Sequence, residues 1–231
     1  MIHKGKKEKV QTVSRSGSPA LSQKLPPIEL LTPTLKSGTS VRESLQQRRT
    51  IREIGDKKLP LQVLSNLLWA ACGVNRKNGP FGIPGRTAAS ASNSQEIDLY
   101  VVTEEGVHLY DPFHHILVPV IAGDMRDLAI GQGQAKLVAN APVHLIYIAD
   151  VHKLSHTSGY QEPGLRDSEI QKSYYYVDTG LIAGNVYLFA ASQGLASWFH
   201  NCNRSGLAAT LKLRADQRVL FGQTVGYPVK K

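Results

Sequence analysis

This sequence has few cysteines and no long apolar run, and both absences exclude classes of protein. Cys72 and Cys202 are the only cysteines among 231 residues, too few for a disulfide framework or a structural zinc site. No stretch approaches the roughly 20 apolar residues that a membrane-spanning helix needs, and the most apolar run, residues 143–149, has only strand length. We therefore expect no membrane span, no metal site and a reducing, cytoplasmic setting.

Acidic residues are scarce near the N-terminus, where the positive charge is concentrated. The formal net charge is +9, and residues 1–24 hold six basic side chains against Glu8 alone. This segment has no helical or strand periodicity, so we expect a flexible basic tail over 1–24 and a folded domain over 25–231. Such a tail leaves a non-enzymatic nucleic-acid-binding protein open as an alternative. The sequence has no helix-turn-helix signature and no basic stripe interleaved with aromatics, so we expect no nucleic-acid partner.

Helical and strand patterns are mixed along the domain without regular alternation. Helices are expected near residues 40–49, 59–72, 124–139, 167–193 and 205–213, and strands near 97–103, 107–110, 143–149, 195–199 and 218–225. Residues 74–86 and 152–163 are expected to be loops. The first helix begins with a capping-box pattern, Ser40 to Glu43. This mixture indicates an α+β fold rather than a doubly wound α/β sheet.

A basic cluster lies where the first helix is expected to end. Arg48, Arg49, Thr50 and Arg52 fall within five residues. Their guanidinium groups repel one another unless an anion or carboxylates lie among them, and a guanidinium offers planar, bidentate donors to phosphate oxygens. Taken alone, the cluster is more typical of a solvated basic helix end, which the helix dipole favours.

Small and amide side chains gather before the strand expected at residue 97. They include Ser90, Ala91, Asn93 and Gln95. Small residues let the backbone approach a flat ligand, and the two amides offer donors and acceptors that suit the carbonyl and N–H edge of an isoalloxazine ring. Taken alone, this segment is more typical of a polar loop.

Together and in this order, these motifs resemble those of the nitroreductase family. The matching segments are Arg48-Arg49-Thr50-Ile51-Arg52, residues 89–96, Asp178-Thr179-Gly180, residues 194–198 and Gly226-Tyr227-Pro228. Their order and spacing agree with the family over about residues 40–231. Ala89 and Glu96 stand where the family pattern has prolines.

The resemblance implies a nitroreductase-like α+β fold, with a mostly antiparallel central sheet flanked by helices, and a homodimer with two FMN sites at its interface. The residues that it assigns to the cofactor are Arg48, Arg49, Thr50 and Arg52 for the phosphate and ribityl chain; Ser90, Ala91, Asn93 and Gln95, from the other subunit, for the ring; Phe199, His200, Asn201 and Cys202 beside the ring; and Lys230 and Lys231 for the phosphate.

The implied activity is a ping-pong hydride transfer from NADH or NADPH, through flavin N5, to a small acceptor such as a nitroaromatic or a quinone. No side chain is assigned as a catalytic base, because the cofactor carries the chemistry. Residues 67–73 also resemble the branch of peptide dehydrogenases that oxidise azoline rings. An FMN-dependent dehydrogenase acting on a peptide or ring substrate therefore stays open, as does a protein that binds flavin without turnover.

Overall fold

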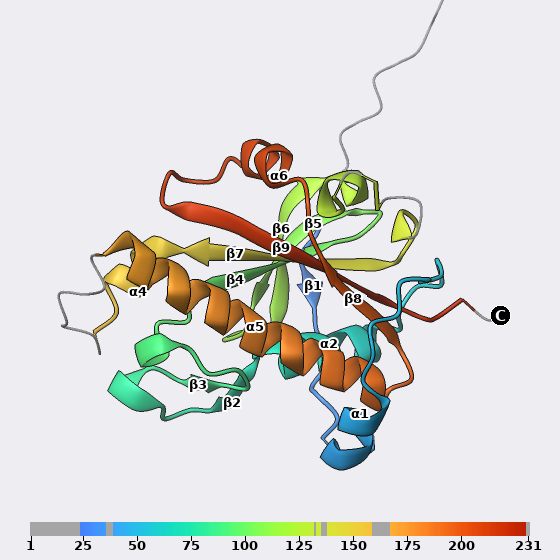
Figure 1. Ribbon diagram of the computed structural model, residues 1–231, viewed down its shortest axis with the longest axis horizontal. Helices are drawn as coiled ribbons and strands as arrows, with labels where there is room; N and C mark the ends of the chain where they lie inside the picture. The colour runs from blue at the N-terminus through green and yellow to red at the C-terminus, as the bar shows by residue number, and fades with distance from the viewer. Residues whose placement is uncertain (1–23, 36–38, 132, 135–137, 159–166, 230–231) are drawn as a thin grey trace, which may run out of the picture.

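The computed structural model describes residues 24–35, 39–131, 133–134, 138–158 and 167–229, which build a seven-stranded sheet with helices on both faces (Figure 1). Its strands are β1 (Ile28–Glu29), β4 (Ile97–Val102), β5 (Gly106–Asp111), β6 (Ile116–Ala122), β7 (Val143–Asp150), β8 (Ala196–His200) and β9 (Gln217–Gly226). Their order is β1-β6-β5-β4-β7-β9-β8, and every neighbouring pair is antiparallel. The expected α+β fold with an antiparallel sheet is confirmed.

Strand β7 is buried along its whole length, which explains its continuous run of apolar residues. Side chains of a strand point alternately to opposite faces. Leu145 and Tyr147 enter one apolar core, while Ile146 and Ile148 enter a second core on the other face of the sheet. The sheet therefore separates two cores, each of which needs its own cover.

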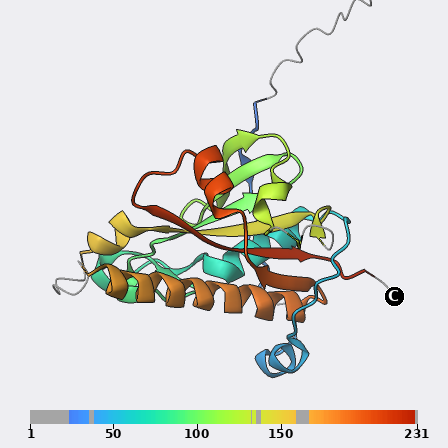
Figure 2. The same cartoon turned by 45° about the horizontal axis from the view of Figure 1, so that its top comes forward.

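Helices supply that cover on both faces. Helix α5 (Ser168–Ser192) and helix α2 (Leu61–Cys72) pack on one face, and helix α6 (Arg204–Thr210) with the 3₁₀ turn η3 (Arg126–Ala129) packs on the other (Figure 2). Figure 1 shows α5 running across the sheet. The 25 residues of α5 span nearly 40 Å at about 1.5 Å per residue, so one helix can contact segments that lie far apart.

The ends of α5 follow the expected signals. The side chain of Asp167 caps its N-terminus by accepting hydrogen bonds from the backbone N–H groups of Glu169 and Ile170. The chain leaves the helix at Gly194, whose φ of +64° is a conformation that glycine adopts without strain.

Helix α1 (Val41–Gln47) packs against α5 and forms the predicted capping box. Ser40 Oγ accepts from the N–H of Glu43 at 3.2 Å, and the Glu43 carboxylate accepts from the N–H of Ser40 at 2.8 Å. The helix ends at Gln47, so the basic cluster begins directly after it.

Three local predictions were wrong. Residues 74–86 are not only a loop, because β2 (Val74–Arg76) pairs with β3 (Gly85–Arg86) around the 3₁₀ turn η1 (Pro80–Gly82). The long helix expected over 124–139 is replaced, in its described part, mainly by η3 and turns. The polar loop expected from residue 152 begins instead with helix α4 (Val151–Ser155), which buries Leu154.

Within the described ranges, no helix is long and apolar enough to cross a membrane. The same residues contain no group of three or more His, Cys, Asp or Glu side chains that could hold a metal ion. Cys72 and Cys202 are free thiols, both buried. Of the tail predicted over residues 1–24, all but Lys24 lie outside the described part of the chain.

Candidate functional site

The basic cluster runs along the outer edge of the sheet. Strand β8 is the last strand in the sheet order, and the N–H of Ile51 donates to the carbonyl of Ser197 on it at 3.1 Å. The neighbouring arginines reach different aromatic rings. The guanidinium carbon of Arg48 lies 5.5 Å from the centre of the Tyr187 ring on α5, and that of Arg52 lies 5.7 Å from the centre of the Trp198 ring.

The guanidinium groups of this cluster are exposed and lack acidic partners. Arg48, Arg49 and Arg52 form no ion pair with a carboxylate in the described part of the chain. Among the described residues, the side chain of Arg49 donates to the carbonyl of Gln47 at 3.1 Å. Three neighbouring cations without carboxylates leave their donors available to an anion, and phosphate oxygens match guanidinium geometry.

One residue that the sequence did not single out, Tyr187, connects the cluster to β8. Its hydroxyl lies 3.1 Å from Thr50 Oγ1 and accepts the N–H of Phe199 at 2.9 Å. Thr50 and Phe199 are 149 positions apart in the sequence, and they meet here through one side chain of α5. No local pattern marks a tyrosine inside a long helix as such a link.

The predicted residues on β8 point to opposite faces of the sheet. Phe199 faces α5, where its ring centre lies 4.8 Å from that of Phe221 and 5.9 Å from that of Tyr147. His200 lies on the other face, with Trp198 at 5.0 Å between ring centres. One flat ligand on the α5 side could therefore contact Phe199 but not the ring of His200.

His200 belongs to a buried chain of hydrogen bonds. Its Nδ1 donates to the carbonyl of Asn201 at 2.8 Å, so its Nε2 accepts the hydroxyl of Thr224 at 2.7 Å. Thr224 Oγ1 in turn accepts from His144 Nδ1 at 2.8 Å. Burial lowers the pKa of His200 and lowers the pKa of His144 to about 3, so both rings are neutral near pH 7. The network holds the backbone at Asn201 and leaves neither ring as a cation.

The segment after β8 is held from a second side. The carbonyl of Asn201 also accepts the N–H of Gly131 at 2.9 Å, and Asn203 N–H donates to Leu128 O at 3.0 Å. Cys202 is buried, and burial raises the pKa of its thiol to about 11. The thiol is therefore protonated near neutral pH and is a poor nucleophile.

The loop before β4 adopts an unusual backbone. Ser92, Asn93 and Gln95 have φ values of +49°, +54° and +52°, a region that costs energy for residues other than glycine and that often occurs at functional sites. Hydrogen bonds hold this shape. Asn93 Nδ2 donates to Ile83 O at 3.1 Å, and Gln95 Nε2 donates to Pro84 O at 2.7 Å. The two amides thus hold the shape of the loop.

The remaining small residues of this loop tie it to itself and to α5. Ser90 Oγ accepts the N–H of Gln95 at 3.0 Å, and the N–H of Ala91 donates to Asp178 Oδ2 at 2.9 Å. Asp178 and Tyr187, which contacts the basic cluster, are nine residues apart on α5, or about 13 Å along the helix. Within one chain, the loop and the basic cluster are therefore separate, and no described contact joins them. Lys230 and Lys231 lie outside the described residues.

The face of α5 between these two segments is apolar and exposed. Val177 is 60% exposed and Leu181 is 44% exposed. Gly180 and Gly184 lie on the same face with no atom within 4 Å of where a Cβ would stand. A contiguous exposed apolar face with small residues is suited to packing against another protein surface.

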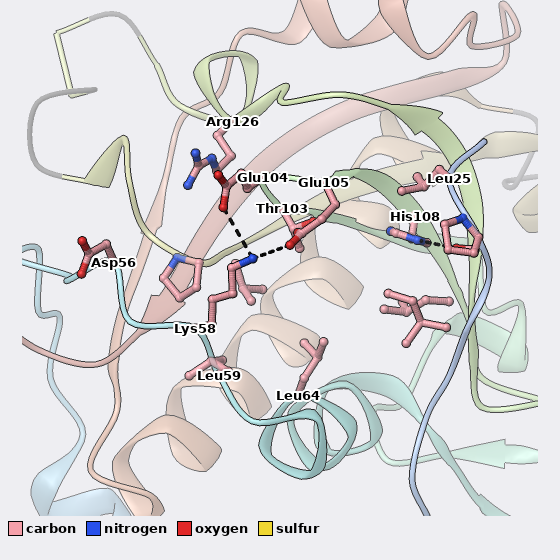
Figure 3. A pocket seen from close by; sticks show the side chains of 15 residues that line it. Leu25, Asp56, Lys58, Leu59, Leu64, Thr103, Glu104, Glu105, His108 and Arg126 are labelled. Carbon is pink, nitrogen blue, oxygen red and sulfur yellow. Dashed lines mark hydrogen bonds and ion pairs between the residues drawn. The ribbon is translucent and has the colours of Figure 1, made fainter. Parts of the chain in front are cut away.

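A well-formed pocket lies elsewhere, between the arm at residues 25–28, the segment at 56–64 and the β4–β5 turn (Figure 3). Its volume is about 310 Å³. Lys58 crosses its mouth to Glu105 at 2.5 Å and Glu104 at 3.5 Å. None of the residues assigned to the cofactor lines this pocket, so the pocket is not the predicted site.

Comparisons with known proteins were made against this fold and this set of residues. The model of the Nitroreductase family matches residues 45–227. A curated protein of Methanocaldococcus jannaschii, named as a nitroreductase, is 32% identical over 160 residues, which cover 66% of this chain and 74% of that protein. A crystal structure from Ralstonia eutropha, also named as a nitroreductase, is 34% identical with a TM-score of 0.78 and covers 92% of this chain and 94% of its own.

A more distant structure shares the fold. It belongs to the Escherichia coli microcin synthetase McbBCD complex with truncated pro-MccB17 bound. It is 20% identical to this chain with a TM-score of 0.64, and the match covers 87% of this chain and 78% of that one.

Proposed function

We propose the function of this chain on the basis of its family, because the chain belongs to the nitroreductase family. The chain is an oxidoreductase, and we propose that it binds FMN and takes electrons from NADH or NADPH. The observation that carries the proposal is the exposed arginine cluster at the edge of β8, which has no carboxylate partner among the described residues. Such a cluster fits a phosphate group.

We assign different parts of FMN to different residues of the cluster. Arg48 and Arg52 would donate to the FMN phosphate, and Thr50, which Tyr187 contacts, would bind the ribityl chain. We propose that Lys230 and Lys231, which lie outside the described residues, add positive charge to the phosphate site. The last described residue, Val229, donates its N–H to Glu53 O at 3.1 Å, one residue after Arg52.

A homodimer completes the proposed site. Within one chain, the loop with Ser90, Ala91, Asn93 and Gln95 contacts α5 about 13 Å along the helix from Tyr187. As the family resemblance implies, we assign this loop to the ring of an FMN held by the partner subunit. The exposed face of α5 around Val177 and Leu181 is the surface that we assign to the subunit contact. Both assignments are tested by the oligomeric state of the protein.

The chain itself positions groups rather than transferring protons at the site. When bound, FMN supplies hydride chemistry at N5. The protein presents the backbone at Asn201 and Cys202, which the His200 and Gly131 contacts hold in place, and positive charge from the cluster favours an anionic ligand. We nominate no side-chain base, because Cys202 is protonated, and both ring nitrogens of His200 are hydrogen-bonded on the face of the sheet away from α5. The acceptor that we propose is a small nitroaromatic or quinone.

The first experiment is FMN binding measured by quenching of flavin fluorescence, with Arg48→Ala, Arg52→Ala and the matched control Arg42→Ala. Arg42 is an exposed arginine one turn or more before the cluster, on α1. Loss of a charge-assisted contact worth about 1.5–3 kcal/mol predicts a rise in Kd of about tenfold or more for each cluster variant. The control is expected to bind like the wild type. Equal affinities in all three variants would remove the cluster from the site.

The visible spectrum under anaerobic NADPH then separates the alternatives. A yellow protein that bleaches is the outcome expected of the proposed oxidoreductase. A yellow protein that stays oxidised points to a dehydrogenase acting on a peptide or ring substrate, the alternative compatible with the fold shared with the microcin synthetase chain. A colourless protein that takes up no FMN overturns the proposal, and salt-sensitive binding to duplex DNA would then favour the nucleic-acid alternative.

A further inference from the structure

Two buried carboxyl groups meet beneath the loop that precedes β4. Glu96 is 0% exposed and Asp178 is 4% exposed. Glu96 Oε1 is buried without a hydrogen-bond partner among the described residues, and the charge of Asp178 lies close enough to raise the pKa of Glu96. A buried carboxylate oxygen without a partner is costly, so a proton on Glu96 is favoured. Glu96 stands where the family pattern that this sequence resembles has a proline.

Each carboxyl group also holds one end of the strained segment. Asp178 Oδ2 accepts the N–H of Ala91 at 2.9 Å, and Glu96 Oε2 accepts the hydroxyl of Ser94 at 2.6 Å. The residues between those two contacts, Ser92 and Asn93, have positive φ values. A strained backbone persists only when its surroundings fix it from several sides, and here the carboxyl pair supplies two of the fixed points.

No cation neutralises the pair within the described structure. Arg86 on β3 lines a small cavity together with Asp178, and its charge acts on Cys72 on α2 and on Asp98 on β4. Asp98 is itself paired with Lys153 on α4 at 2.5 Å. Burial, and then the neighbouring charge of Asp178, raises the pKa of Glu96 to about 8. The buried Cys72 thiol, with a pKa raised to about 11, is neutral as well. The proton on Glu96 is therefore retained at neutral pH and lost above it.

We infer that Glu96 and Asp178 form a carboxyl clamp, which carries one proton and holds the 91–95 segment in the shape that receives FMN. The clamp rests on the proposed function, because the segment is assigned to the cofactor there. Both residues are positioning residues, since they touch the loop rather than the ligand. When the proton of the clamp is lost, two neighbouring carboxylates repel each other in a buried site, and the segment between Ala91 and Ser94 loosens.

The test compares wild type with Glu96→Gln, which keeps a hydrogen-bond donor but cannot ionise, and with Glu104→Gln, an exposed glutamate on the β4–β5 turn as the matched control. The first measurement is hydrogen exchange of the peptide over residues 88–97 in the protein without FMN, at about pH 7 and pH 9. Wild type and Glu104→Gln are expected to exchange about tenfold faster than Glu96→Gln at the higher pH, and equally at the lower pH.

The second measurement is the Kd for FMN over the same range. The wild-type affinity for FMN is expected to fall about tenfold for each pH unit above the pKa of Glu96, because only the protonated clamp binds FMN. The affinity of Glu96→Gln is expected to be independent of pH. If Glu96→Gln does not fold, Asp178→Asn takes its place, since it also removes the second carboxylate.

The outcomes separate the clamp from the proposed function. Identical pH courses of loop exchange in wild type and Glu96→Gln would overturn the clamp, whatever FMN does. A chain that binds no FMN at any pH overturns the proposed function, while the exchange measurement still decides whether the two carboxyl groups hold the loop.

Discussion

At the scale of single residues, Tyr187 has the largest number of roles in the candidate site. Its ring lies beneath Arg48, and its hydroxyl contacts Thr50 and accepts the N–H of Phe199. Removing the hydroxyl leaves that N–H without its acceptor while the ring contact with Arg48 is kept. The hydroxyl therefore stabilises the junction of the basic cluster, α5 and β8.

We predict that Tyr187→Phe lowers the free energy of unfolding by about 1–2 kcal/mol, because a part-buried N–H loses its partner. FMN affinity is expected to fall several-fold at the same time, since Thr50 loses its contact. Urea unfolding and FMN titration measure the two effects. Tyr176→Phe is the control, because the substitution removes the Tyr176 hydroxyl and keeps the packing of the ring against Phe221. A Tyr187→Phe protein as stable as this control would contradict the role of the hydroxyl.

Some of these residues could be predicted from the sequence and others could not. Arg48 and Arg52 are marked by local composition, since clustered guanidinium groups need an anion or solvent. Tyr187 and the contact between Glu96 and Asp178 are not marked, because each depends on segments that the fold brings together from distant parts of the chain. The opposite orientations of Phe199 and His200 follow from strand alternation once β8 is known.

At the scale of elements, α5 carries both halves of the proposed site and an exposed apolar face between them. Asp178 contacts the loop, Tyr187 contacts the basic cluster, and Val177 and Leu181 point outward. A helix built in this way is suited to pairing with a second copy of itself. The subunit contact and the cofactor site are therefore expected to depend on each other.

We predict that the double variant Val177→Glu with Leu181→Glu converts a dimer into a monomer, because two buried charges at an apolar contact lack partners. Light scattering after size exclusion measures the mass. FMN binding is expected to be lost with the dimer, because the loop of the partner is withdrawn. Val118→Glu, an exposed apolar position on β6, is the matched control. A wild-type protein that is a monomer at micromolar concentration would contradict the assignment.

Elements with strong local signals were predicted, and elements that depend on tertiary context were missed. Helices α1 and α5 were predicted because local residues mark their ends. Ser40 and Glu43 form the capping box of α1, and α5 begins after Asp167 and ends before Gly194. Strand β6 was missed because it contains Pro119, which lacks a backbone donor. The structure accommodates Pro119 opposite His108, next to the irregularity in the β5–β6 pairing.

At the scale of the whole molecule, two buried groups on different faces of the sheet set opposite pH dependences of stability. The pKa of His144 is lowered from 6.5 to about 3, so its stabilising contribution is complete above pH 6.5 and is lost as pH falls toward 3. The pKa of Glu96 is raised from 4.5 to about 8, so its contribution is complete below pH 4.5 and is lost as pH rises through 8.

We predict that these groups give a maximum of stability between about pH 4.5 and 6.5, with a decline on both sides. Thermal unfolding midpoints at a series of pH values measure the curve. Glu96→Gln is expected to flatten the decline between pH 7 and pH 9 and to leave the acid side unchanged, because His144 is untouched. An alkaline decline that persists in this variant would show that other groups cause it.

The position of β9 has a consequence for how the chain is made. The last strand in the sequence lies inside the sheet, where it pairs with β7 on one side and β8 on the other. While the nascent chain emerges from the ribosome, β7 and β8 have no partner in common until β9 follows them. The edge that carries the arginine cluster is therefore assembled last. A stalled chain that ends before residue 217 would leave the edges of β7 and β8 that face β9 unpaired and open to other strands.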